Sequence, residues 1–156
     1  MSITHSLKPA DMKREFIVEI ITGLLIMLFV YTALSKLLVY NSFKAVLLTA
    51  PMLQPFAATL AWTVPASEIV VSFLLFLPRH RLLGLYASLG ILVLFTLYLG
   101  FMLLYSPHLP CSCGGVISQL TWQEHFLFNL FFMALNSIAI KLNKPSIRPN
   151  ILYNQA

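Results

Sequence analysis

Four long apolar segments constrain the fold of this chain more than any other feature of its sequence. They run from about Phe16 to Leu38, Pro55 to Leu77, Leu82 to Tyr105 and Trp122 to Leu142. Each is long enough to cross the hydrocarbon core of a bilayer as a helix, which takes roughly 20 apolar residues. Backbone groups in lipid must satisfy their own hydrogen bonds, and the unbroken apolarity of these segments excludes the alternating pattern of barrel strands. We therefore predict an all-α integral membrane protein that folds as a four-helix bundle.

The composition agrees with a membrane protein, because 59% of the residues are hydrophobic and only 10% are charged. The first apolar segment exceeds the roughly 7 to 15 residues of a signal-peptide core, so we expect a membrane helix and not a cleaved leader. One domain then covers residues 16–142, between an N-terminal segment 1–15 and a tail 143–156. A short interfacial helix is expected between the first two spans, within residues 39–54.

The ten basic residues predict how the helices cross the membrane. Eight of them lie before the first span, between the second and third spans, or after the fourth: Lys8, Lys13, Arg14, Arg79, Arg81, Lys141, Lys144 and Arg148. Lys36 and Lys44 lie on the opposite side, and the loop from Ser106 to Thr121 contains no Lys or Arg. The positive-inside rule therefore places both termini in the cytoplasm and this loop on the periplasmic side of a bacterial inner membrane. Orientation explains the surplus of positive charge, so we expect membrane lipid and no nucleic acid as a partner.

Both cysteines of the chain lie in that loop, in the sequence Cys111-Ser112-Cys113-Gly114-Gly115. Two thiols separated by one residue form a disulfide only if the backbone turns sharply, and Gly114 and Gly115 supply that freedom. A bridge closed so tightly is strained, and strained, accessible disulfides take part readily in thiol exchange. We therefore predict that Cys111 and Cys113 are redox-active in the oxidising periplasm.

Two other interpretations of the cysteine pair stay open. A structural disulfide between such near neighbours would close a very small loop and would gain little entropy. A metal site would combine His108, Cys111, Cys113 and His125, a ligand set acceptable to zinc or cuprous copper. One residue between the cysteines is fewer than the two to four of common zinc sites, which counts against this interpretation.

The start of the fourth span places a polar face beneath the loop. The sequence from Thr121 to Glu124 fits a capping box, which predicts that the helix begins at Trp122 and that Glu124 is a cap. Trp122, His125 and Asn129 are spaced i, i+3 and i+7, so they share one helical face, and polar side chains at this depth normally face the bundle interior. We predict that His125 moves protons during thiol exchange, with Trp122 and Asn129 in support. Interhelical hydrogen bonding alone is the alternative role for His125 and Asn129.

Glu68 is a carboxylate inside the second apolar segment, one turn after Pro65. Ionisable side chains at membrane depth are rare and commonly functional. Lys36, at the end of the first span, is the expected partner, and Pro65 would kink the second helix and loosen its hydrogen bonding near Glu68. The alternative is a paired or neutral carboxyl that only fixes the register of the helices.

Short motifs are distributed along the whole length of the four spans. They are Ser35-Lys36-Leu37, Pro65-Ala66-Ser67-Glu68, Phe95-Thr96-x-Tyr98, and Pro110-Cys111-Ser112-Cys113-Gly114-Gly115 followed by Trp122, His125 and Asn129. Together they resemble the DoxX-like membrane proteins, and among these the MauE branch, the methylamine utilisation proteins and their relatives. The resemblance covers the chain from about residue 14 to residue 142.

This resemblance implies a four-helix protein of the bacterial inner membrane that takes part in thiol–disulfide chemistry. MauE proteins are linked to disulfide formation or maturation of a periplasmic enzyme, alongside a thioredoxin-like partner. The expected partners of Cys111 and Cys113 are therefore the thiols of a periplasmic thioredoxin-like protein or of a substrate protein. Four-helix membrane oxidases that generate disulfides use two cysteine pairs, whereas this chain has one. By analogy with them alone, a quinone is a candidate electron acceptor. A non-catalytic subunit that docks or stabilises a redox partner is the competing hypothesis.

Overall fold

The computed structural model describes residues 9–49, 53–105 and 122–143, and every regular element within these ranges is helical. In chain order the elements are α1 (Pro9–Leu38), α2 (Tyr40–Thr49), the 3-10 helix η1 (Gln54–Phe56), α3 (Ala57–Phe76), α4 (Arg81–Tyr105) and α5 (Trp122–Leu142). Four stretches of the described chain are long and apolar enough to cross a membrane: Met12–Leu38, Gln54–Phe76, Arg81–Phe101 and Gln123–Leu142. The prediction of an all-α bundle of four spanning helices is confirmed.

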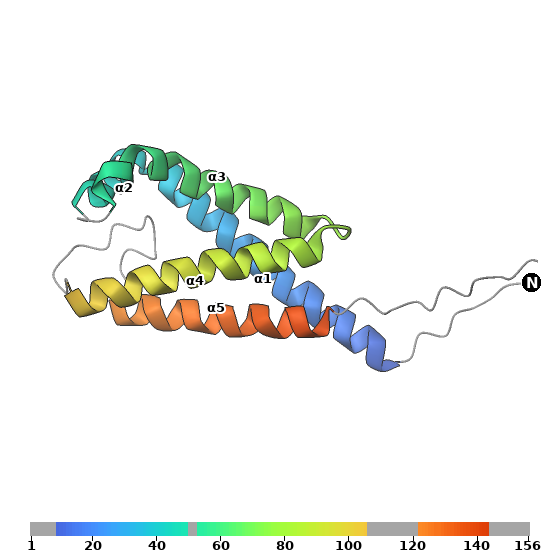
Figure 1. The fold of residues 1–156 in the computed structure, drawn as a ribbon. Coiled ribbons are helices and arrows are strands. Elements are labelled where there is room, and N and C mark those ends of the chain that lie inside the picture. The colour runs from blue at the N-terminus through green and yellow to red at the C-terminus, as the bar shows by residue number, and fades with distance from the viewer. Residues whose placement is uncertain (1–8, 50–52, 106–121, 144–156) are drawn as a thin grey trace, which may run out of the picture.

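The four spanning helices form a ring in which each runs in the opposite direction to its neighbours (Figure 1). Helices α1 and α4 each contact both α3 and α5, while α2 and η1 pack against the start of α3. The start of α1, the α3–α4 turn and the end of α5 consequently lie at one end of the bundle (Figure 1). The ends of α1 and α4 and the start of α5 lie at the other end, together with α2 (Figure 1).

The described basic residues divide unequally between these ends. The end that contains the α3–α4 turn, called the basic end below, carries Lys13, Arg14, Arg79, Arg81 and Lys141. Here the Arg14 guanidinium donates to the Leu142 carbonyl at 3.4 Å, which ties the start of α1 to the end of α5. Lys36 and Lys44 belong to the opposite end, called the loop end because α4 and α5 meet residues 106–121 there.

Helix α1 begins at Pro9 and not near Phe16, where the apolar segment starts. Its 30 residues make it about 45 Å long at 1.5 Å per residue, which exceeds the roughly 30 Å of the hydrocarbon core. Apolarity indicates only the part of a helix that lies in lipid, whereas the backbone can remain helical through the polar residues that precede it. Proline is well tolerated at the first position of a helix, because that amide has no partner within the helix in any case.

Two apolar clusters pack the helices together. The larger one joins all four spanning helices and consists of Ile21, Leu25, Phe29, Val71, Leu75, Leu85, Leu92, Phe132 and Ala139. The smaller one packs α2 against the start of α3 and consists of Phe43, Leu47, Ala57 and Ala61. Lipid tails are as apolar as these side chains, so van der Waals packing drives the association of the helices more than exclusion from water does.

Gly84 marks a very close approach of two helices. A Cβ atom at this position would lie 2.8 Å from the backbone nitrogen of Leu75 and 3.0 Å from the carbonyl carbon of Leu74. Helix α4 therefore rests directly on the backbone of α3, near the turn that joins them. Small residues permit this kind of contact between membrane helices. The contact fixes α3 against α4 at the basic end.

Candidate functional site

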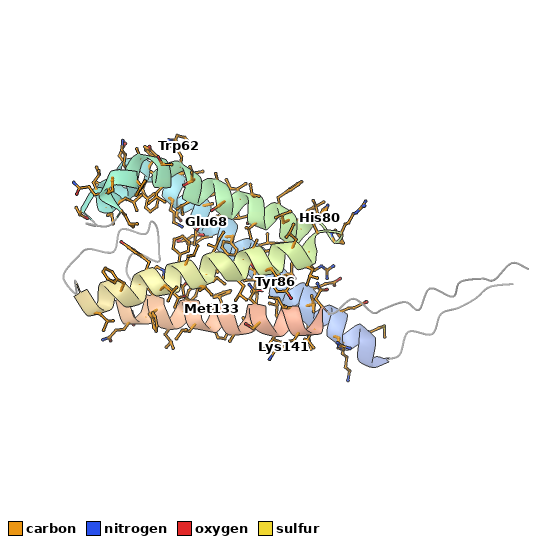
Figure 2. All side chains as sticks on the ribbon, in the orientation of Figure 1. Trp62, Glu68, His80, Tyr86, Met133 and Lys141 are labelled. Carbon is orange, nitrogen blue, oxygen red and sulfur yellow. The ribbon has the colours of Figure 1, made fainter. Side chains whose placement is uncertain are left out.

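A buried ion pair joins α1 to α3 inside the bundle. The Lys36 Nζ atom lies 2.6 Å from Glu68 Oε1, and only 7% and 2% of the two side chains are exposed. The predicted pairing of Lys36 with Glu68 is therefore confirmed as a contact. Lys36 belongs to the last turn of α1, and Figure 2 shows Glu68 on the side of α3 that faces α4. The lysine side chain thus extends inward from the loop end to reach a carboxylate near the middle of α3.

Helices α1 and α4 complete the surroundings of the Lys36 ammonium. Nζ lies 3.5 Å from the backbone carbonyl of Thr32 and 5.4 Å from the centroid of the Phe95 ring. A carbonyl dipole and an aromatic face both attract a cation. Groups from α1, α3 and α4 therefore compensate the buried positive charge of Lys36.

The segment of α3 around Glu68 contains an internal proline. Pro65 is fully buried and has no N–H group, so it cannot donate to the carbonyl of Ala61, yet α3 is a single helix from Ala57 to Phe76. One turn later, the Ser72 hydroxyl donates to the backbone carbonyl of Glu68 at 2.9 Å. Backbone and side-chain hydrogen bonding thus hold the middle of α3 in place, despite the missing amide.

His125 and Asn129 contribute the polar face of α5. Asn129 is buried, His125 is half-buried, and the preceding Glu124 is exposed in the first turn of the helix. His125 lies near the start of α5 at the loop end, the end from which Lys36 enters the bundle on α1. We call Lys36, Glu68 and His125 the ionisable cluster. It draws on three of the four spanning helices.

Two atoms of the ionisable cluster lack a partner among the described residues. Glu68 Oε2 and His125 Nδ1 are both buried without a hydrogen bond. Leaving a buried polar atom unpaired costs about 1–3 kcal/mol, and Asn136 Oδ1 is a third such atom among the described residues. A cluster with a fixed positive charge, a carboxylate and an imidazole can accept and release protons within a membrane.

Comparison with known families adds to this geometry. The family model of the methylamine utilisation protein MauE matches residues 14–142. The chain belongs to the MauE family. The match spans all four membrane helices, the ionisable cluster and the segment that contains both cysteines. Membership of the MauE family and the four apolar helices together identify a multi-pass membrane protein. No curated protein and no solved structure matches the chain, and the wider resemblance to DoxX-like proteins stays a prediction.

A second buried polar contact in this MauE-family protein was missed by sequence reasoning. Asn136 Nδ2 on α5 donates to Ser88 Oγ at 2.7 Å and to the Leu85 carbonyl at 3.2 Å, and neither Asn136 nor Ser88 is exposed. Both acceptors are oxygens, which fixes the orientation of the amide. Asn136 follows Asn129 by seven residues, so it continues the polar face of α5 by one heptad. The seven-residue spacing from Asn129 was the sequence pattern that could have identified Asn136 as a buried polar residue.

The cysteine site that the MauE match covers lies outside the described residues. His108, Cys111, Cys113, Gly114 and Gly115 all belong to residues 106–121. Thiol exchange and the alternative metal site therefore both stay predictions. Within the described ranges, no group of three or more His, Cys, Asp or Glu side chains is arranged to hold a metal ion. Trp122 is the first residue of α5, where the capping-box pattern predicts the helix to begin.

Proposed function

We propose that this MauE-family protein exchanges disulfides with a periplasmic thioredoxin-like or maturing substrate protein through Cys111 and Cys113. The observation that carries the proposal is the position of the ionisable cluster. Lys36 and His125 both lie in the half of the bundle next to the loop end, to which the cysteine-containing segment is attached. Thiol exchange needs proton transfer beside the sulfur atoms, and an imidazole is the usual side chain for it.

Chain connectivity keeps the cysteines near this end. Cys111 follows Tyr105, the last residue of α4, by six positions, because 111 minus 105 is 6. Six residues extend at most about 22 Å. A partner that meets the thiols therefore approaches the loop end, which the positive-inside rule assigns to the periplasm.

The proposed reaction consists of two consecutive displacements at sulfur. One thiolate of the reduced pair attacks the partner's disulfide, which forms a mixed disulfide and releases one partner thiolate. The second thiolate then attacks the mixed disulfide, which leaves a disulfide on this chain and a dithiol on the partner. Two electrons pass to the partner, and the two protons lost by Cys111 and Cys113 end on the partner's sulfur atoms. His125 takes up and returns a proton during the transfer, and the reverse reaction uses the same steps in the opposite order.

Trapping of the mixed disulfide in cells tests this proposal. The full-length variants Cys111→Ser and Cys113→Ser are expressed, free thiols are blocked by alkylation, and adducts are separated without reductant. We expect at least one single-cysteine variant to carry a partner protein that reductant releases. The double variant Cys111→Ser/Cys113→Ser is the matched control and carries none. If neither single variant is trapped and the wild-type pair stays permanently oxidised, the exchange proposal is wrong and a structural disulfide replaces it.

Two further outcomes of the same experiments would support the competing hypotheses. If the partner's redox state is unchanged in both serine variants, the thiols are incidental and the protein is a docking or stabilising subunit. If the purified protein carries stoichiometric zinc or copper that is lost in His108→Ala and His125→Ala, the loop is a metal site.

Replacing His125 tests its proposed role separately from that of the sulfur atoms. His125→Gln keeps a polar side chain but cannot act as a general acid or base near neutral pH. General acid–base catalysis contributes about 10²–10⁴-fold to rates, so we expect exchange with the partner to slow by at least tenfold while the thiols still form a mixed disulfide. An unchanged rate in rapid-quench assays would assign His125 to interhelical packing.

A further inference from the structure

A cavity opens on the surface of the bundle at the basic end, between the first half of α1 and the turn that joins α3 to α4 (Figure 1). Its volume is about 170 Å³, and side chains from α1, α3 and α4 line it. One buried water needs roughly 10–15 Å³ of such a cavity. The space between the three helices can therefore hold part of a molecule much larger than water.

Two side chains of opposite charge line this cavity. Glu19 on α1 contributes an exposed carboxylate, and Arg81, the first residue of α4, contributes a half-buried guanidinium. Neither side chain forms an ion pair or a hydrogen bond with another described residue, although both line the same cavity. Both charges are therefore available to a ligand that fits between the helices.

The cavity becomes apolar toward the middle of the bundle. Glu19, Thr22 and Ile26 follow one face of α1 at spacings of three and four residues, and Ile26 lies about 10 Å further into the bundle than Glu19. Leu75 and Phe76, at the end of α3, complete the apolar wall. Because 72% of Phe76 is exposed, this wall continues onto the outer surface of the span.

Gly23 keeps the α1 side of the cavity open. This residue is exposed, and a Cβ atom at its position would meet no atom of another helix within 4 Å. Gly23 thus differs from Gly84, which marks a close approach of two helices. A larger side chain at Gly23 would occupy part of the cavity before it reached a neighbouring helix.

The charges and the apolar wall together select a class of ligand. A guanidinium binds a phosphate through two parallel N–H donors, and a carboxylate binds an ammonium. The Thr22 hydroxyl donates to the Val18 carbonyl at 2.7 Å, so it can still accept from an ammonium. A pocket with basic side chains alone would suit an anionic lipid, whereas the carboxylate of Glu19 repels a second negative charge. A phosphate and an ammonium joined to apolar chains make a zwitterionic phospholipid.

We propose that this cavity binds the headgroup of an ethanolamine phospholipid, with its phosphate on Arg81, its ammonium on Glu19 and its acyl chains along Ile26 and Phe76. Ethanolamine fits better than choline, because a primary ammonium has three N–H donors and a quaternary ammonium has none. Arg81 begins the third spanning stretch, and the ends of the spans are the level at which lipid headgroups lie. The lipid site does not depend on the proposed thiol exchange.

Native mass spectrometry of the full-length protein in mild detergent tests the proposal. The protein is mixed with equal amounts of phosphatidylethanolamine, phosphatidylcholine and phosphatidylglycerol that carry identical acyl chains, and the bound lipids are quantified. We expect the wild type to retain one phosphatidylethanolamine in preference to the other two by about threefold or more, the effect of one exposed charge contact. Glu19→Gln should remove the preference over phosphatidylcholine, and should equal the wild type when phosphatidylcholine is the sole lipid. Arg81→Gln should weaken the binding of all three by about tenfold.

Further variants separate the cavity from the surface charge around it. Glu19→Lys leaves two cations in the cavity, so the preference should move to the anionic phosphatidylglycerol. Gly23→Leu fills the cavity and should abolish selective retention, while its Cβ meets no described neighbour. The matched controls are Glu15→Gln and Arg79→Gln, which remove exposed charges at the same end outside the cavity and should keep the selectivity of the wild type.

Three results would overturn the proposal. Equal retention of the three lipids by the wild type would show that the cavity does not select a headgroup. Loss of selectivity in either control variant would assign the effect to general surface charge. Displacement of the bound lipid by an equal concentration of soluble glycerophosphoethanolamine would show that the acyl chains contribute nothing. Retention should be unchanged in Cys111→Ser/Cys113→Ser, so that a failure of thiol exchange does not affect the outcome.

Discussion

Removing one partner of the Lys36–Glu68 pair is expected to destabilise the bundle far more than removing both. Lys36→Met leaves a buried carboxylate without its counter-ion, and Glu68→Met leaves a buried ammonium. Breaking a buried pair in this way costs about 3–5 kcal/mol of unfolding free energy. The double variant removes both charges and fills the space with side chains of similar volume, so its stability should lie within about 1 kcal/mol of the wild type.

Coulomb's law gives the scale of the attraction between the two residues. At the observed 2.6 Å, two unit charges attract each other by about 6 kcal/mol if the effective dielectric constant is about 20. Desolvation of the two ions offsets most of this attraction, which is why the pair as a whole contributes little. Two single losses of about 3–5 kcal/mol and a near-neutral double variant imply a coupling energy of about 6–10 kcal/mol, which is of the same order as the Coulomb value.

Reversible unfolding in lipid nanodiscs measures all four free energies of this cycle. Lys44→Met and Glu19→Met are the controls, because they remove a lysine and a glutamate that lie outside the ionisable cluster. Each should change the unfolding free energy by less than about 0.5 kcal/mol. The reasoning is refuted if the two single effects simply add in the double variant, since Lys36 and Glu68 would then contribute independently.

Three other predictions follow from the packing and the charge distribution. Gly84→Ala places a Cβ atom 2.8 Å from a backbone atom of α3, so it should lower the unfolding free energy by about 1–3 kcal/mol in the same assay. Gly90→Ala is the control: its Cβ meets no described atom within 4 Å, so it should be neutral or slightly stabilising. Asn136→Leu removes the hydrogen bonds to α4 and should cost only about 1 kcal/mol, because interhelical hydrogen bonds in bilayers are weak; a loss above about 3 kcal/mol would contradict this account. In a cysteine-free background, Ser42→Cys should react with a membrane-impermeant maleimide in intact cells and His80→Cys only after lysis, and the reverse pattern would invert the proposed orientation.

The sequence alone was sufficient for the positions of the spans and for one contact between two helices. Span positions follow from apolar length, and the Lys36–Glu68 contact could be expected because two isolated charges in apolar helices have few possible partners. The Asn136–Ser88 contact could not be derived in this way. Asn136 has the heptad spacing of a polar face, but its partner depends on how α4 and α5 are rotated and shifted against each other. The first turns of α1 were missed because they lie outside the apolar segment that defined the helix.

The two ends of the bundle differ in what their buried contacts can do. At the basic end, the Gly84 backbone contact and the Asn136–Ser88 hydrogen bond are neutral and closely packed, and neither includes an ionisable group. Between the middle of the bundle and the loop end, the buried polar groups include the ionisable side chains of Lys36 and Glu68, and the half-buried His125 lies in the same half. Substitutions of Gly84, Ser88 or Asn136 should therefore lower the stability of the protein while leaving the rate of thiol exchange per folded molecule unchanged. Substitutions of Glu68 or His125 should lower that rate even where the protein remains folded, because they remove groups that can carry a proton. A variant at the basic end that slowed exchange without loss of stability would show that this division is wrong.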